Sequence, residues 1–345
     1  MTSGAAAGTH ARLESGPRLA FRPARTDELA ACADVWRLSI DDYVGRLNQP
    51  PLPIENASLV RLYTHLRTTD PERFVVATVP ATDAAAGIDA PTGERVVAFA
   101  SAVVRERLWY LSMLFVLPEL QSTGVGRALL REVAPPPGID VARATATDTA
   151  QPISNALYAS LGIVPRAPLL NLVGLPERAE AFGLLPDGVH AVPFGDDSGT
   201  RRDDSQPAGS GAAAGPVDEL DALDRAVLGV AHPADHAFVR AEGRRGWAYR
   251  GPAGELLGYG YAGEVGRVGP VAVRDADLVA PILGHLMTAV RPRGAFAVWL
   301  PGNADRALTA ALRSGLRLEP FPVLLCWDRP FVDLARYLPT SPGLL

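Results

Sequence analysis

The sequence has no lysine among its 345 residues, so every cationic side chain other than histidine is an arginine. Alanine, glycine and proline are used heavily at the same time, which indicates a coding bias more than a function. Cysteine is also scarce, with Cys32 and Cys326 far apart in apolar surroundings. A disulfide framework or a cysteine zinc site needs more than two, so we expect two small buried residues and no metal.

Long apolar runs are absent as well, and none reaches the roughly 20 residues that a membrane-spanning helix needs. Residues 1–17 are small and polar and lack the apolar centre of a signal peptide. The net charge of −5 provides no basic surface for nucleic acid. We therefore expect a cytoplasmic protein that binds neither membranes nor nucleic acid. Its length favours two domains, and its assembly is left open between monomer and homodimer.

One stretch, residues 108–133, predicts a strand, a turn and a helix. Residues 110–117 form an apolar run of strand length that is rich in residues favouring β-structure. Pro118 ends this run, because proline has no N–H for a sheet. Apolar residues then recur at helical spacing, namely Val125, Ala128, Leu129 and Val133.

Two glycines in the turn, Gly124 and Gly126, make it suitable for binding a ligand. Because they lack Cβ atoms, the backbone can come close to a ligand, and the following helix presents free N–H groups and the positive end of its dipole. This arrangement suits a phosphate or pyrophosphate. The P-loop pattern is excluded because no Gly-Lys-Ser/Thr follows, and the dinucleotide pattern because residue 129 is leucine. An ordinary strand-to-helix turn is the alternative.

The pattern V-x-P-x-x-Q-x-x-G-x-G is filled in order by Val116, Pro118, Gln121, Gly124 and Gly126. It resembles the acyl-CoA-binding motif of the GCN5-related N-acetyltransferases and lies between the expected strand and helix. The resemblance implies acetyl-CoA as co-substrate, with pantetheine along the strand and the pyrophosphate on backbone amides of the turn. The residues implied for pantetheine are Phe115, Val116 and Leu117. Those implied for the pyrophosphate are Gln121, Ser122, Thr123, Gly124, Val125 and Gly126, with Arg127 as a further cofactor contact.

A helix expected over residues 152–161 resembles a second motif of this family, with an asparagine, a Leu-Tyr pair and a closing Leu-Gly. The resemblance implies that Asn155 contacts the cofactor and that Tyr158 protonates the departing CoA thiolate. A core aromatic on an amphipathic helix is the alternative for this tyrosine. Gln151 departs from the family, in which an asparagine often opens the helix. A backbone N–H near Leu117 is expected to stabilise the developing oxyanion.

Candidates on the acceptor side are weaker. Asp41, Asp42 and Tyr43 lie where the resembling family lines its acceptor pocket, and the two carboxylates could attract an amine. We favour the alternative, a solvated helix end, because charged residues are usually exposed. Residues 110–117 contain no carboxylate that could act as general base. Glu106, Asp41 or a chain of water molecules are left for that role.

The C-terminal half repeats the first, with a helix, a small-residue stop and a strand at 308–330 as at 157–176. Aligning the copies pairs the motif residues Gln121, Gly124 and Gly126 with Leu278, Pro281 and Leu283. A proline removes an amide donor, and side chains replace both glycines. Thr309 stands opposite Tyr158. We therefore expect the second copy to have lost the cofactor site.

The sequence thus predicts an α/β (α+β) fold of two tandem acetyltransferase-like domains, each a mostly antiparallel mixed twisted sheet flanked by helices. The expected parts are a disordered tail at 1–17, a catalytic domain at 18–176, a connector at 177–189 with a short helix across 176–186, a degenerate domain at 190–335 with a disordered loop at 196–215, and a C-terminal tail at 336–345. The expected function is acetyl transfer to a primary amine of a small molecule by direct attack. A protein or peptide N-acetyltransferase and a non-catalytic acyl-CoA-binding or sensing protein are the alternatives.

Overall fold

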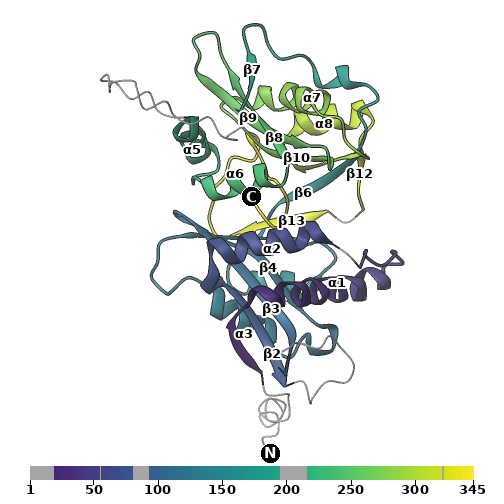
Figure 1. The fold of residues 1–345 in the computed structure, drawn as a ribbon, viewed down its shortest axis with the longest axis vertical. Helices are drawn as coiled ribbons and strands as arrows, with labels where there is room; N and C mark the ends of the chain where they lie inside the picture. Colours follow the sequence, from purple (N-terminus) through teal and green to yellow (C-terminus); the bar gives the residue numbers. More distant parts are fainter. Residues whose placement is uncertain (1–18, 55, 81–92, 195–215, 321) are drawn as a thin grey trace, which may run out of the picture. The chain divides into compact units, whose positions relative to one another are not determined.

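The computed structural model describes residues 19–54, 56–80, 93–194, 216–320 and 322–345. The backbone divides into two compact units, whose helices and strands are labelled in Figure 1. Unit 1 comprises Met1–Val103 and Met113–Pro137, and unit 2 comprises Val104–Ser112 and Gly138–Leu345. In the described residues, no helix combines the length and the apolar character that a membrane span requires.

Unit 1 is built on a sheet in which consecutive strands lie side by side. The strands are β1 (Ala20–Pro23), β2 (Phe74–Pro80) and β3 (Glu94–Arg105), paired antiparallel in that order, followed by the end of β4 (Leu108–Val116). The helices are α1 (Leu29–Arg46), α2 (Ala57–Thr69) and α3 (Val125–Val133).

Aromatic rings form part of the core of unit 1. Tyr63 of α2 lies edge-on to Phe74 of β2 and Phe99 of β3, with ring centroids 5.7 and 5.3 Å apart. Every residue of β2 before Pro80 is buried, as expected for a continuous apolar run covered on both faces. Helix α3 packs against this same strand, which fixes the position of the helix that follows the glycine turn.

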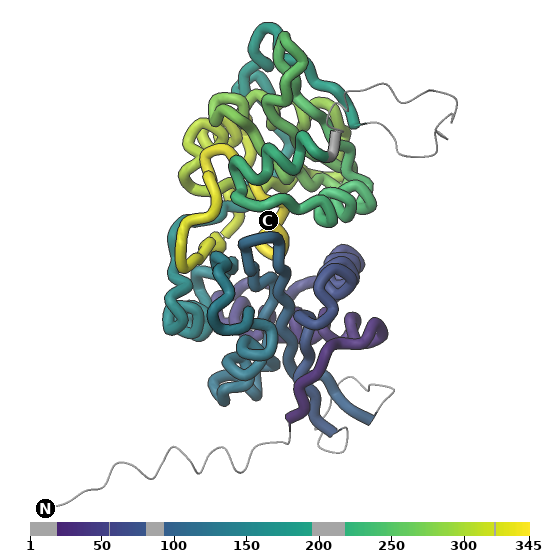
Figure 2. The backbone as a smooth tube through the Cα atoms, turned by 90° about the vertical axis from the view of Figure 1, so that its left-hand side faces the viewer, coloured from purple at the N-terminus to yellow at the C-terminus, as the bar shows by residue number. Residues whose placement is uncertain are grey.

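Unit 2 contains a mixed sheet in which distant parts of the chain alternate. The first residues of β4 pair in parallel with β5 (Ala142–Asp148), and β13 (Val323–Trp327) lies antiparallel between β5 and β6 (Val164–Gly174). Beyond β6 the order is β11 (Phe296–Pro301), β10 (Arg267–Val273), β9 (Leu256–Gly263), β8 (Arg244–Arg250) and β7 (His190–Pro193). In Figure 2 the yellow C-terminal chain accordingly runs beside teal segments from the middle of the sequence.

The remaining elements of unit 2 are five helices and two short strands among its described residues. The helices are α4 (Pro152–Ala159), α5 (Pro216–Val227), α6 (Pro233–Ala241), α7 (Val279–Ala289) and α8 (Asp305–Ser314). Strand β12 (Arg317–Leu318) pairs with β6, and β14 (Tyr337–Leu338) pairs with β10.

The predicted internal repeat is visible in the order of elements. Strand β4, the 3-10 turn η4 (Pro118–Leu120), helix α3 and strand β5 correspond to β10, η6 (Ala276–Leu278), α7 and β11. In both series the strand before the helix runs parallel to the strand after it. The expectation of a second copy of the same strand–turn–helix unit is therefore confirmed.

Some local expectations were wrong or incomplete. The short helix expected across residues 176–186 is a single 3-10 turn, η5 (Ala179–Phe182), because Gly183 with φ 76° ends it and buried Phe182 turns into the core. Helix α6 and the placement of β13 between β5 and β6 are not among the expected elements. The tail expected at 336–345 is packed, with β14 in the sheet and Leu344 only 1% exposed. The disorder expected at 1–17 and 196–215 lies outside the described residues.

Candidate functional site

The turn between β4 and α3 is open to solvent. Ser122, Thr123 and Gly124 are all exposed, and the backbone reaches positive φ at Ser122 (63°) and Gly124 (99°). A Cβ atom added to Gly124 would meet nothing within 4 Å. Positive φ explains the glycine, and the open space beside it is what a closely approaching ligand requires.

Helix α3 begins directly at this turn and leaves its first amides without helical partners. The Ala128 N–H donates to the Gly124 carbonyl over 3.0 Å, and Gly124 supplies no side-chain cap. The preceding amides, those of Val125, Gly126 and Arg127, therefore have no acceptor within the helix. Together with the positive end of the helix dipole, they form a site that suits a pyrophosphate.

Side chains hold the turn against the end of β4. The Val116 carbonyl accepts hydrogen bonds from Gln121 Nε2 at 3.1 Å and from Ser39 Oγ at 2.8 Å. The Gln121 side chain thus positions the turn, and Thr123 Oγ1 does the same by donating to Leu120 O at 2.7 Å. Ser39 was missed in the sequence, although a serine four residues after Val35 on the buried face of α1 was a usable signal.

Phe115 and Leu117, two of the residues predicted to contact pantetheine, lie at the end of β4 and have different neighbours. The Phe115 ring is half-buried and stacks on Phe99 with centroids 5.7 Å apart. The Leu117 N–H donates to the Val97 carbonyl of β3 over 3.0 Å. That donor is committed to the sheet, which corrects the expectation that the Leu117 amide stabilises an oxyanion. Because successive N–H groups of a strand point to opposite edges, the Val116 N–H faces away from β3.

The second motif belongs to unit 2 and is organised by Asn155. Its Nδ2 donates to the carbonyls of Asp148 at 3.0 Å and Gln151 at 2.8 Å, which ties α4 to the end of β5. Its Oδ1 is buried and has no hydrogen-bond partner among the described residues. An unpartnered buried acceptor is costly, so this atom fits a hydrogen-bond donor supplied by a ligand.

Tyr158 of α4 is nearly covered, with 4% of its surface exposed. Burial raises the pKa of its hydroxyl well above the ordinary value, and nearby Cys326 acts in the same direction, while a hydrogen bond with Ser154 opposes them. The hydroxyl therefore keeps its proton at neutral pH. This state is the one that a general acid needs.

The acidic residues predicted near the acceptor have structural partners. Asp41 accepts the Leu52 N–H at 2.7 Å and pairs with Arg37 at 3.3 Å, and Asp42 pairs with Arg46. Tyr43 follows them on α1 and is half-buried. Both carboxylates are partly buried and paired with arginines, which differs from the solvated helix end that we favoured, and their role in binding an amine stays a prediction.

Glu106 lies in the turn between β3 and β4, where it adopts a positive φ of 47°. Its carboxylate pairs with Arg225 in unit 2 at 2.8 Å. This ion pair would have to open before the carboxylate could take a proton from a substrate. The role of general base for Glu106 stays a prediction.

The corresponding turn of the second copy contains no such site. Helix α7 has Leu278 at its N-cap instead of a left-handed glycine, and Pro281 lies in its first turn. The Asp275 carboxylate accepts the Asp277 N–H at 3.0 Å and so caps η6, the 3-10 turn that leads directly into α7. This geometry agrees with the loss that the aligned residues predict.

Comparison with known proteins identifies the first copy. Residues 47–163 match the model of the Acetyltransferase (GNAT) family, a range that includes the glycine turn and Tyr158. This part of the chain is therefore similar to a GNAT domain. No curated protein matches the chain.

Solved structures show that the GNAT fold extends over nearly the whole chain. A putative acetyltransferase from Pyrococcus horikoshii is 14% identical, with 95% of this chain and 96% of that chain covered at a TM-score of 0.65. A GCN5-related N-acetyltransferase from Sphaerobacter thermophilus is 15% identical, with 92% and 98% covered at 0.53. A tandem GNAT protein from the clavulanic acid biosynthesis pathway is 16% identical, with 91% and 99% covered at 0.51. The chain therefore has the tandem GNAT fold, and the GNAT family in general uses acetyl-CoA.

Proposed function

We propose that this protein is an acetyl-CoA-dependent N-acetyltransferase that acetylates a primary amine of a small molecule. The observation that carries the proposal is the open turn at Gly124, with the first amides of α3 directly behind it. The second copy lacks this feature, so the proposal assigns one cofactor site to each chain. The tandem neighbour supports a small acceptor, since its name places it in the biosynthesis of clavulanic acid, a small molecule.

The proposed reaction is direct attack of a neutral amine on the thioester carbonyl, with the CoA thiolate as leaving group. We assign the oxyanion to the Val116 N–H, because Leu117 donates to β3. Tyr158 would protonate the thiolate, which its buried, protonated hydroxyl allows. Asp41 and Glu106 are both ion-paired, so we propose that the proton of the ammonium substrate leaves through water.

Cofactor binding is tested with two matched glycine substitutions. Gly124→Val and Gly138→Val both place a β-branched side chain on a left-handed glycine with nothing within 4 Å, so their backbone strain is comparable. We expect Gly124→Val to weaken CoA binding about tenfold or more, since hydrogen bonds to a charged group are worth about 1.5–3 kcal/mol each. Gly138→Val should bind as wild type does in titration calorimetry.

Turnover is tested by following CoA release with small amines and with peptide amines in parallel. Release with a small amine, together with loss in Gly124→Val, is the expected result. Preferential release with peptides would favour the protein N-acetyltransferase. Tight CoA binding without release for any amine would favour an acyl-CoA-binding or sensing protein. Equal CoA binding by Gly124→Val and wild type would contradict the proposed site itself.

A further inference from the structure

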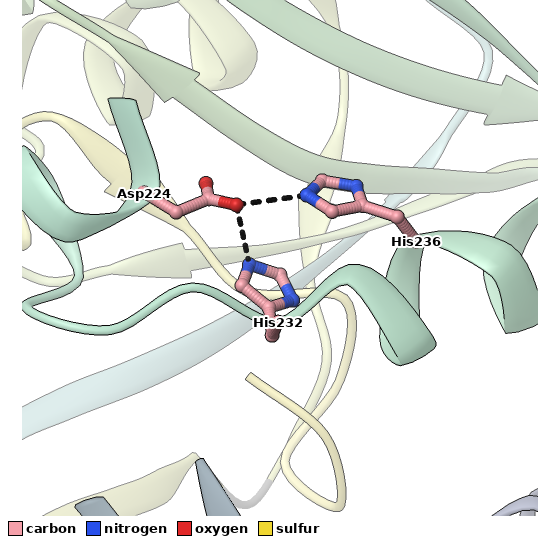
Figure 3. Close-up of side chains that lie close together, drawn as sticks. All are labelled: Asp224, His232 and His236. Atoms are coloured by element: carbon pink, nitrogen blue, oxygen red, sulfur yellow. Dashed lines mark hydrogen bonds and ion pairs between the residues drawn. The ribbon is translucent and has the colours of Figure 1, made fainter. Parts of the chain in front are cut away.

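A second group of chemically active side chains lies in unit 2, between α5 and α6. Asp224 comes from the last turn of α5, His232 is the residue before α6, and His236 lies one turn into that helix. Figure 3 shows the two imidazole rings pointing at the same carboxylate oxygen. The three residues are 0%, 2% and 3% exposed, so none of them is a surface group.

The three ligand atoms converge closely. Asp224 Oδ2 lies 2.8 Å from His236 Nε2 and 3.3 Å from His232 Nε2, and the ligand atoms of all three residues lie within 4.8 Å of one another. Zinc takes nitrogen and oxygen ligands at about 2.0–2.2 Å in a tetrahedron, which places the ligand atoms about 3.3 Å apart. The His232 distance fits this spacing, and the His236 distance would need to open by about 0.5 Å.

Two of the three residues have polar partners on their outer atoms. His236 Nδ1 lies 2.9 Å from the Tyr261 hydroxyl, and Tyr259 donates to Asp224 Oδ1 at 2.6 Å. Metal-binding histidines characteristically have such a partner on the nitrogen that faces away from the ion, and His236 has it. His232 Nδ1 has no hydrogen-bond partner among the described residues and lies 3.8 Å from the Asp235 carboxylate.

We propose that Asp224, His232 and His236 bind a divalent transition-metal ion with the ligand preferences of zinc. The Tyr337 hydroxyl lies 3.5 Å from His232 Nε2, on the same nitrogen that faces Asp224. Because every ligand is buried, the ion has a structural role and fastens α5 to α6. The two imidazoles suit zinc, iron or nickel far better than magnesium or calcium, which prefer oxygen ligands. The sequence prediction of no metal considered only cysteines as ligands. The pattern that indicates this site is Asp224, followed eight residues later by His232 and four residues after that by His236.

The test measures metal content directly, without reference to acetyl transfer. The full chain is stripped with a chelator, supplied with Zn²⁺ or Co²⁺ alone, desalted and analysed by mass spectrometry for metal per chain. We expect about one ion per chain, a visible absorption band for the cobalt form, and a higher Tm for both metal forms. A wild-type chain that retains neither ion and shows no change in Tm would overturn the proposal, whatever the variants do.

Three variants separate ligands from neighbours. Asp224→Asn removes the anionic ligand and should abolish retention of the ion. Tyr261→Phe removes only the hydroxyl beside His236 and should weaken affinity about 10–100-fold, the usual cost of losing such a partner. His285→Gln is the matched control, because His285 also bonds a tyrosine hydroxyl, that of Tyr249 at 2.8 Å, but lies outside the cluster. Retention by Asp224→Asn equal to that of wild type would contradict the proposed ligands.

Discussion

Tyr158 carries the proton that a general acid must donate, and burial makes that proton harder to release. An ordinary tyrosine has a pKa near 10, and the surroundings of this hydroxyl move its pKa further up. The side chain therefore keeps its proton across the neutral and mildly alkaline range. A core aromatic would be buried in the same way, so burial alone does not separate the two interpretations of this residue, and a kinetic measurement is needed.

We expect Tyr158→Phe to lower kcat about 10²–10⁴-fold with little change in acetyl-CoA affinity, because the variant loses the proton donor and keeps the ring. Stopped-flow or steady-state rates give kcat, and titration calorimetry gives the affinity. Tyr249→Phe is a suitable control, since Tyr249 is also buried but its hydroxyl bonds His285. Unchanged kcat in Tyr158→Phe with a good amine would make Tyr158 a core residue.

A second residue-scale prediction concerns Glu28 at the start of α1. Its side chain is 4% exposed and accepts two bonds from Arg22, at 2.8 and 2.6 Å, and one from the Arg25 N–H at 2.7 Å. Burial alone would raise the pKa of Glu28, but these donors, Arg22 first, lower it below the usual value. We expect Glu28→Gln to reduce the free energy of unfolding by about 2 kcal/mol at pH 7.

The pH dependence of that loss has a definite sign. A carboxyl with a lowered folded-state pKa stabilises the protein above its unfolded pKa of about 4.3, and this contribution disappears as the pH falls through the folded-state value. Urea unfolding curves of wild type and Glu28→Gln should therefore converge in acid. Glu94→Gln is the control, because Glu94 pairs with the same Arg22 but is much less buried, with 36% of its side chain exposed, and its loss should cost less than about 1 kcal/mol. Equal losses for the two variants would contradict the argument from burial.

At the scale of elements, the strand, turn and helix over residues 108–133 could be predicted because every signal in them is local. The apolar run, Pro118, the two glycines and the helical spacing all act within a few residues of one another. The position of β13 could not be predicted, because its partners β5 and β6 lie more than 140 residues earlier in the chain. The Asp224 cluster differs, because its three residues lie within 13 positions of one another and only its tyrosine neighbours come from other elements.

The two helix starts should also differ in CoA binding. The amides at the start of α3 are open, whereas α7 has Pro281 in its first turn and continues directly from η6, which Asp275 caps. We expect calorimetry of the full chain to give one CoA site, and Gly124→Val to weaken that single site and leave no site of wild-type affinity. A stoichiometry of two, or a site of unchanged affinity in Gly124→Val, would show that the second copy binds the cofactor.

For the whole molecule, the topology of unit 2 makes the C-terminal half part of the sheet that carries Tyr158. Strand β13 pairs with β5 from Val323 opposite Asp148 to Trp327 opposite Ala144, and with β6 on its other side. Strand β4 also depends on the chain after β13, because the hydroxyls of Tyr110 and Ser112 donate to the carbonyls of Pro342 and Gly343. Removal of the second copy would therefore expose the edges of β5 and β6 and uncover part of β4.

We accordingly expect a chain ending at Pro186 to be poorly soluble, because unpaired strand edges are templates for aggregation. Size-exclusion chromatography and circular dichroism of the shortened chain test this, with the full chain as reference. Leu325→Arg in the full chain tests the same dependence on β13 without removing the second copy. Leu325 is 3% exposed, so a buried charge there should lower Tm. If the shortened chain is instead soluble and acetylates the same amine at the full rate, β5 and β6 must pair directly in its absence. In that case the second copy contributes neither stability nor catalysis, and the acceptor site lies within the first copy.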